Sequence, residues 1–286
     1  MPESFDAARE RALARLVGRD RTATVIGGGS GIGRGVALGL AAEGMHVVVA
    51  DKDGRSAEAV RDEVAAGGGE ASAAEVDATE RSSLEALGSL VERERGAVDV
   101  LVTTFGAIVS RRAVDASDAE WGWMLELNLL AHLRAVRVFL PRLRAARGPA
   151  HVVLTASLGG LITPTPDESR GFDLGPYVAS KHALVAAAET LRDELAPEGI
   201  GVSVLCPTRI AGDLVRTSSR HRPARFGGPA PPPSTADDPP DLLPGEAAGP
   251  LVVRAIRDRR FLVLTHASSL SRVERHHRRR ESDASD

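Results

Sequence analysis

The sequence predicts an α/β fold, in which a doubly wound parallel sheet of about seven strands is flanked by helices in a single domain. Apolar, β-branched runs alternate with segments of helical periodicity along most of the 286 residues. Repeated β-α units of this kind form parallel sheets with right-handed crossovers. The aromatic content is only 3%, so the core must consist mainly of Val, Leu, Ile and Ala. Such a core suits a parallel sheet covered by helices on both faces.

Changes in composition divide the chain into three parts. Residues 1–19 are predicted to form a helical extension, because apolar residues recur at helical spacing between charged ones over residues 3–17. Residues 20–270 form the main domain. Within it, a Pro- and Gly-rich stretch around residues 209–250 has little periodicity and predicts a long loop beside the substrate site. Residues 271–286 are predicted to be a flexible C-terminal tail.

Composition also excludes several classes of function. The net charge of −3 gives no case for nucleic acid as a partner. The arginines and histidines of residues 272–280 are interpreted as a solvated helix end rather than a binding patch. No stretch approaches the ~20 apolar residues that span a bilayer, so no membrane partner is expected. The single cysteine, Cys206, fits a reducing cytoplasm, and no group of residues has metal-ligand spacing.

The first predicted β-α unit contains a nucleotide site. A β-branched strand over residues 22–26 leads into Gly27-Gly28-Gly29-Ser30-Gly31-Ile32-Gly33 and then a helix over residues 34–43. Glycines in this position allow close backbone approach, and the start of the helix offers free N–H groups to phosphate, as in Rossmann-like folds.

The second strand, over residues 45–51, ends on an acid about 20 residues after the glycines. Asp51 would accept hydrogen bonds from the adenosine ribose hydroxyls and repel a 2′-phosphate. NAD(H) is therefore the preferred cofactor, with NADP(H) as the alternative. Asp51 could otherwise be only a turn residue or a helix cap, and the adjacent Lys52 counts against the preference.

The alternation continues along the chain, and we expect each later strand to place its following residues at the same edge of the sheet. The further predicted strands span residues 70–76, 98–103, 151–155, 201–206 and 260–265. The further predicted helices span residues 56–66, 79–95, 117–146, 176–196, 210–216 and 245–257.

The only tyrosine of the chain, Tyr177, precedes Lys181 by four residues in a segment that reads as helix with Pro176 in its first turn. Side chains at this spacing share a face, so the ammonium group is expected to lower the phenol pKa from its usual value near ~10. Tyr177 is therefore a candidate proton carrier. An ordinary buried tyrosine beside a surface lysine is the alternative.

The order and spacing of these residues resemble the short-chain dehydrogenase/reductase family, in its classical form, over about residues 20–270. The resemblance implies a catalytic set of Ser157, Tyr177 and Lys181 supported by Asn128. Ser157 would bind the substrate oxygen, Lys181 would hold the nicotinamide ribose, and Asn128 would hold a water in a proton relay. The implied cofactor-binding residues are Gly27, Gly29, Ser30, Gly31, Ile32, Gly33, Asp51, Lys52, Asp77, Ala78, Thr104, Phe105, Gly106, Tyr177, Lys181, Pro207, Thr208 and Ile210.

The chain departs from the family pattern in the cofactor cradle. Ile26 stands where the family has a threonine, and Thr103-Thr104-Phe105-Gly106 replaces Asn-Asn-Ala-Gly. The Pro-Gly pair after the sixth strand is Pro207-Thr208, and Gly212 replaces a threonine expected to touch the diphosphate.

Two functions from different classes follow. The first is an NAD-linked oxidoreductase that interconverts a secondary alcohol and a ketone on a small to medium, largely apolar substrate. Residues 217–223 and 260–266 look like those of members acting on alicyclic, terpenoid or steroid-like alcohols. The second, suggested by the altered cradle, is a catalytically idle NAD-binding scaffold or sensor of the same fold. The resemblance also implies a homodimer or homotetramer.

Overall fold

The computed structural model describes residues 16–169, 171–212, 214–230 and 241–285. Their seven strands form one parallel sheet in the order β3-β2-β1-β4-β5-β6-β7. The strands are β1 (Thr22–Ile26), β2 (His46–Asp51), β3 (Glu70–Glu75), β4 (Val100–Thr103), β5 (Ala150–Thr155), β6 (Ile200–Cys206) and β7 (Leu262–Leu264). The strand order reverses between β1 and β4, and this switch point is where such sheets bind ligands.

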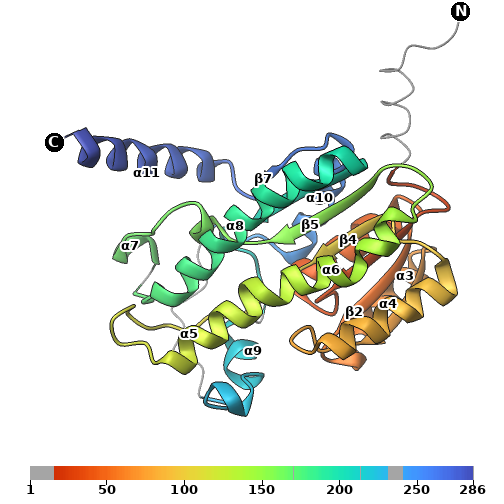
Figure 1. Cartoon of the computed structure of the whole chain (residues 1–286), viewed down its shortest axis with the longest axis horizontal. Coiled ribbons are helices and arrows are strands. Elements are labelled where there is room, and N and C mark those ends of the chain that lie inside the picture. Colours follow the sequence, from red (N-terminus) through yellow and green to blue (C-terminus); the bar gives the residue numbers. More distant parts are fainter. Residues whose placement is uncertain (1–15, 170, 213, 231–240, 286) are drawn as a thin grey trace, which may run out of the picture.

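Helices cover both faces of the sheet (Figure 1). On one face lie α4 (Arg81–Arg95), α6 (Ala131–Arg144) and α8 (Gly175–Leu195), which pack against the sheet through one aliphatic cluster. On the other lie α2 (Gly31–Ala42), α3 (Gly54–Ala66) and α10 (Ala248–Arg257), through a second cluster. The predicted doubly wound single domain is therefore confirmed.

The helix predicted over residues 117–146 is interrupted. It divides into α5 (Asp118–Leu125), a π-helical turn η1 (Glu126–Leu130) and α6. A π-turn inserts one extra residue into the helical repeat and often marks a functional position. Here the turn is centred on Asn128, whose side chain is fully buried.

The two ends of the chain lie partly outside the described residues. The helix predicted over residues 3–17 lies almost entirely outside the described residues, of which Leu16 and Val17 are buried against the α2 side of the sheet. The segment predicted as a flexible tail belongs to one helix, α11 (Ser268–Ser285), and residues 272–280 were interpreted as a helix end. Its first turns are tied to the domain by an ion pair between Arg272 and Glu168 at 3.1 Å.

The Pro- and Gly-rich region contains a helix, α9 (Leu214–Arg220), four residues later than predicted. Helix α9 begins later in the sequence because the backbone just before it is hydrogen-bonded to Leu243. Ala211 N–H donates to the Leu243 carbonyl at 2.8 Å, and Leu243 N–H donates to the Arg209 carbonyl at 3.0 Å. None of the helices in the described part of the chain combines the length and hydrophobicity needed to cross a bilayer.

Candidate active site

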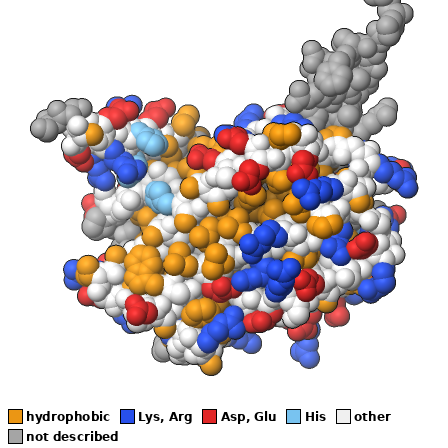
Figure 2. Space-filling view, viewed as in Figure 1, with side chains coloured by type: hydrophobic (Ala, Val, Ile, Leu, Met, Phe, Trp, Pro, Cys, Tyr) orange, Lys and Arg blue, Asp and Glu red, His pale blue; other side chains and the backbone are white. Residues whose placement is uncertain are grey.

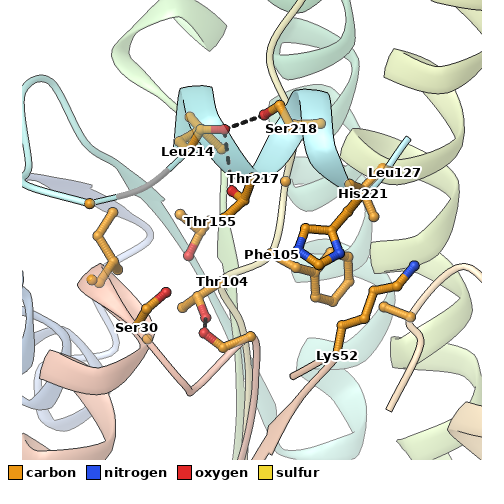
Figure 3. A pocket seen from close by; sticks show the side chains of 18 of the residues that line it. Ser30, Lys52, Thr104, Phe105, Leu127, Thr155, Leu214, Thr217, Ser218 and His221 are labelled. Carbon is orange, nitrogen blue, oxygen red and sulfur yellow. Dashed lines mark hydrogen bonds between the residues drawn. The ribbon is translucent and has the colours of Figure 1, made fainter. Parts of the chain in front are cut away.

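A cavity of about 540 Å³ lies at the carboxyl ends of the strands. Residues of the β1–α2 turn line one end of the cavity and residues from the start of α8 line the other. Helix α9 lies across it (Figure 3). All but two of the predicted site residues line it: Gly27, Ser30, Gly31, Ile32, Gly33, Asp51, Lys52, Asp77, Ala78, Thr104, Phe105, Gly106, Ser157, Tyr177, Lys181, Pro207, Thr208 and Ile210. The two exceptions, Gly29 and Asn128, lie behind the lining.

The glycine turn is closed by a hydroxyl from the residue after β4, the strand beside β1 in the sheet. Gly27 adopts a φ of +84°, and Thr104 Oγ1 donates to the Gly27 carbonyl at 2.8 Å. Thr104 also lies 3.1 Å from the Ile26 carbonyl. The chain thus restores, through Thr104, a turn-stabilising hydroxyl of the kind that is absent at Ile26. A glycine turn of this kind at the start of a helix can receive a phosphate group.

Gly33 has no room for a side chain. A Cβ there would lie 1.9 Å from the Gly27 carbonyl oxygen and 2.6 Å from Thr104 Oγ1. We expect Gly33→Ala to open the turn and to lower NADH affinity by at least about tenfold, equal to about 1.4 kcal/mol. Fluorescence titration with NADH measures this effect. Gly18→Ala is the control, because its Cβ would meet nothing within 4 Å, and equal NADH affinities of the two variants would contradict the prediction.

The acid at the end of β2 is fixed by backbone amides. Asp51 Oδ2 accepts from Gly29 N–H at 2.9 Å, and Oδ1 accepts from Asp53 N–H at 3.1 Å. Gly29 therefore acts by orienting Asp51 and does not itself line the cavity. A carboxylate held at this position can also accept hydrogen bonds from ribose hydroxyls, because each oxygen has two lone pairs.

Lys52, which follows Asp51 in the chain, pairs with Asp77. Its ammonium lies 2.8 Å from Asp77 Oδ2, and Thr79 N–H and Oγ1 donate to Asp77 Oδ1 at 2.9 and 2.7 Å. Burial alone would raise the pKa of Asp77, but Lys52 and Thr79 outweigh it and lower that pKa below its usual value. Asp77 is thus ionised, and Lys52 is paired with it across this end of the cavity.

Asn128 does not line the cavity, and it hydrogen-bonds the backbone of the segment after β4. Its Oδ1 accepts from Ala107 N–H at 2.8 Å, and its Nδ2 donates to the Ala107 carbonyl at 2.8 Å and to Ser180 Oγ at 3.0 Å. A Cβ on Gly106 would lie 3.2 Å from Asn128 Oδ1 and 3.3 Å from Lys181 Nζ. The glycine therefore lets this segment pass between the asparagine and the lysine.

Phe105 lines the cavity, and its ring also packs against a buried histidine. Its ring stacks on His132, with centroids 4.2 Å apart and planes at 24°. His132 is fully buried, and burial, together with the charge of Lys181, holds its pKa well below the usual value. The ring of His132 is thus neutral, and the bulk of Phe105 is accommodated by this stack.

Tyr177 and Ser157 meet at the far end of the cavity. Both line it, from the start of α8 and from the end of β5. Burial raises the pKa of Tyr177 above its usual value, while its hydrogen bond with Ser157 acts in the opposite direction. The sequence-based expectation of a lowered pKa is wrong for this structure, because loss of hydration outweighs any effect of the lysine four residues later.

Lys181 lies beneath them and is 3% exposed. Its Nζ donates to the Thr155 carbonyl at 3.0 Å. Burial lowers the pKa of this ammonium group to about 7. A lysine with a pKa near neutrality can gain and lose a proton during a reaction at physiological pH.

The segment after β6 is tied to the C-terminal part of the domain. Thr208 N–H donates to Thr265 Oγ1 at 3.1 Å, and the Thr208 and Ser269 hydroxyls lie 2.7 Å apart. Ala211 and Gly212 lie over Gly31, with the Ala211 carbonyl 3.4 Å from the position of a Gly31 Cβ. The backbone of this segment therefore closes the cavity beside the glycine turn.

Further residues complete the cavity wall, and the sequence indicated some of them. They come from α5, η1, α9 and the residue after α9, and include Trp123, Leu127, Leu214, Thr217, Ser218 and His221. Figure 3 shows α9 above the cavity, with the Thr217 and Ser218 hydroxyls directed to the Leu214 carbonyl. Ser218 Oγ also accepts from Ile108 N–H at 2.8 Å, which fixes α9 to the segment after β4. The loop predicted over residues 209–250 and the resemblance of residues 217–223 indicated this region, whereas no sequence signal indicated Trp123.

Comparison with known proteins agrees with this geometry. The model of the short chain dehydrogenase family matches residues 21–223. The 1-deoxy-11-beta-hydroxypentalenate dehydrogenase of Streptomyces avermitilis is 30% identical over 254 residues, which are 88% of this chain and 87% of that enzyme. The enzyme of the same name from Streptomyces exfoliatus is 33% identical over 198 residues, 68% of this chain and 70% of the relative.

A solved structure is similar over nearly the whole chain. The crystal structure of a short chain dehydrogenase/reductase from Burkholderia phymatum in complex with NAD has a TM-score of 0.81 and 28% sequence identity, and the match covers 94% of this chain and 96% of that one. The chain has a seven-stranded sheet, a glycine turn, and Ser157, Tyr177 and Lys181 at one end of its cavity. It belongs to the short-chain dehydrogenase/reductase family of oxidoreductases.

Proposed function

We propose that the protein is an NAD(H)-linked dehydrogenase that interconverts a secondary alcohol and a ketone, with Tyr177 as the acid and base. One observation carries this proposal. A single cavity has the glycine turn and Asp51 at one end and Ser157, Tyr177 and Lys181 at the other. A cradle for a dinucleotide and a proton carrier thus share one space, as a hydride-transfer enzyme requires.

Two features of the cavity support this cofactor. The turn formed by Gly27, Gly33 and Thr104 leads into α2, and the first N–H groups of a helix have no partner within it and can bind phosphate. Asp51, which accepts from Gly29 N–H, would accept ribose hydroxyls. When bound, the nicotinamide supplies or accepts the hydride. Every other step falls to side chains of this chain.

In alcohol oxidation, Tyr177 would give up its phenol proton as it takes the hydroxyl proton of the substrate, and in the reverse direction its phenol would donate a proton to the ketone oxygen. Ser157 would hydrogen-bond the same oxygen as charge develops on it. Lys181, whose pKa burial lowers to about 7, would pass the proton onward. Asn128 would act as a positioning residue, because its side-chain amide holds Ala107 and Ser180.

The substrate would be of small to medium size and largely apolar. Trp123, Leu127 and Leu214 supply apolar walls near the reacting end. The similar Streptomyces enzymes are named for a hydroxylated pentalenate, which supports an alicyclic or terpenoid-like alcohol. A steroid-like skeleton belongs to the same chemical class. The lone and buried Cys206 supports a cytoplasmic location.

A panel of cyclic secondary alcohols and ketones, assayed by NADH absorbance, tests the proposal. The competing hypothesis is an idle NAD-binding scaffold or sensor, suggested by the altered cradle. The enzyme hypothesis predicts turnover of at least one alicyclic member. NADH binding without turnover of any member would favour the scaffold.

Asp51 is expected to set the choice of cofactor. Asp51→Ala should reduce the preference for NAD(H) over NADP(H) by at least about tenfold, because the carboxylate that repels a 2′-phosphate is lost. Dissociation constants for both reduced cofactors measure the change. Asp62→Ala removes the same charge from an exposed position on α3 that does not line the cavity, and should leave the preference nearly unchanged. A wild-type protein that binds NADPH more tightly would overturn this assignment.

An apolar face suggests that the protein is a homodimer or homotetramer. Figure 2 shows hydrophobic side chains gathered over α6 and α8. Leu125 at the end of α5 and Leu130 at the end of η1, just before α6, are 37% and 44% exposed. On α8, the small residues Ala179, Ala183, Ala186 and Thr190 recur at helical spacing on a side that faces solvent. Apolar surface of this kind is usually covered by a partner, and we propose a second copy of the chain.

A further inference from the structure

A second cavity, of about 780 Å³, lies between α11 and the N-terminal end of α8. We call it the α8–α11 groove. One wall is apolar and includes Trp121, Phe172 and Val178. The other is formed by α11, with His276, Arg279, Arg280 and Asp283 at helical spacing. The groove thus has an apolar floor and a mainly basic rim.

The basic rim belongs to a helix that projects from the domain. Figure 1 shows α11 leaving the body beside α8 and running outward to the C-terminus. Beyond the Arg272–Glu168 ion pair, α11 carries Arg275, Arg278, Arg279 and Arg280. We call residues 275–280 the basic arm. Its charge faces solvent, and in Figure 2 arginine and histidine side chains border the hydrophobic patch over α6 and α8.

The opposite end of α8 is acidic. Asp193, Glu194 and Glu198 are exposed there. Asp193 accepts a hydrogen bond from its neighbour Arg192 at 2.9 Å, and Glu198 forms an ion pair with Arg144 at 2.6 Å. Glu194 is therefore the carboxylate of this end best suited to meet a new cation.

A two-fold dimer through α8 would bring these two ends together. The interface of such a dimer is isologous, so an axis crossing α8 at right angles makes the two copies of the helix antiparallel. The small-residue stripe is centred between Leu184 and Val185. An axis at that point pairs Ala179 with Thr190 of the partner subunit. It also sets Gly175, which lines the α8–α11 groove, opposite the partner's Glu194.

We propose that the basic arm of each copy clamps the acidic end of α8 of the other, with Arg279 and Arg280 binding the partner's Glu194. The proposal rests on the dimer face put forward above as part of the proposed function. Arginine forms strong two-point pairs with carboxylates, and the apolar floor of the groove would be covered at the same time. The symmetry gives two clamps in each dimer.

The test is a charge swap measured by sedimentation equilibrium. Arg279→Glu/Arg280→Glu should raise the dimer Kd at least about tenfold, because attraction becomes repulsion at both clamps. Glu194→Arg should weaken the dimer as well, and the combined variant should recover most of the wild-type affinity. The control is Arg275→Glu/Arg278→Glu, which changes the charge equally at arginines that do not line the groove and should have little effect. High salt should weaken the wild-type dimer.

The outcomes separate the clamp from the proposals it rests on. A dimer Kd that Arg279→Glu/Arg280→Glu leaves unchanged overturns the clamp. A combined variant that does not recover the wild-type dimer affinity overturns it as well. Ala183→Glu should dissociate the dimer by placing charge in the stripe, and a dimer insensitive to it overturns the α8 face. A monomeric wild-type protein overturns both. NADH-linked turnover is measured separately, so a lack of activity bears on the enzymatic proposal alone.

Discussion

Tyr177→Phe is expected to lower NAD-linked turnover by about 10²- to 10⁴-fold, the usual contribution of a positioned general acid or base. The substitution removes one hydroxyl and keeps the ring that fills the 8%-exposed position at the start of α8. It removes the hydrogen bond with Ser157 but leaves the glycine turn and Asp51 intact. NADH affinity should therefore change little.

The measurement is kcat for the best substrate of the alcohol panel, beside an NADH titration and a thermal melt of the same sample. Ser157→Ala is the comparison, since it removes the other hydroxyl of the pair and should reduce kcat while leaving the proton carrier in place. A Tyr177→Phe variant with kcat within a factor of about two of wild type would contradict the role of Tyr177.

Lys181→Met is expected to abolish turnover and to stabilise the fold at neutral pH. Burial lowers the pKa of Lys181 from its usual 10.5 to about 7. Between these two values the unfolded chain holds a proton that the folded protein does not, so folding costs free energy and stability rises with pH. The cost is full below pH 7 and disappears as pH approaches 10.5.

Urea unfolding from neutral pH to about pH 9.5 measures the effect. The free energy of unfolding of wild type should rise relative to Lys181→Met by on the order of 1.4 kcal/mol per pH unit. Lys52→Met is the matched control, because Lys52 has 42% of its side chain exposed and its removal should leave the slope of wild type unchanged. Parallel pH curves for wild type and Lys181→Met would show that the lysine is not desolvated.

The fold was predictable because its determinants are local. Each strand is a short apolar run, and each crossover helix has a clear apolar stripe, so the sequence contains the β-α alternation directly. The strand at residues 22–26 is found with the predicted bounds, and most others differ by one or two residues. The glycine turn and Asp51 were predictable for the same reason, since both directly follow a strand.

The parts that failed depend on tertiary contacts. The start of α9 is set by pairing of Ala211 with Leu243, 32 residues away in the chain. The pKa of Tyr177 is set by burial, which the spacing to Lys181 does not reveal. Trp123 and Leu214 reach the cavity only because α5 and α9 pack beside it. Asn128 and Gly29 act behind the cavity wall, where sequence spacing alone cannot separate lining residues from supporting ones.

The most direct test of hydride transfer uses NADH carrying deuterium at both C4 positions of the nicotinamide. Wild-type protein is incubated with the ketone panel, and the product alcohols are analysed by mass spectrometry. We expect one deuterium on the carbinol carbon of an alicyclic product, and at least about 10²-fold less of this product with Tyr177→Phe. Absence of deuterated alcohol from every ketone, together with no NADH binding at millimolar concentration, would contradict the proposed function.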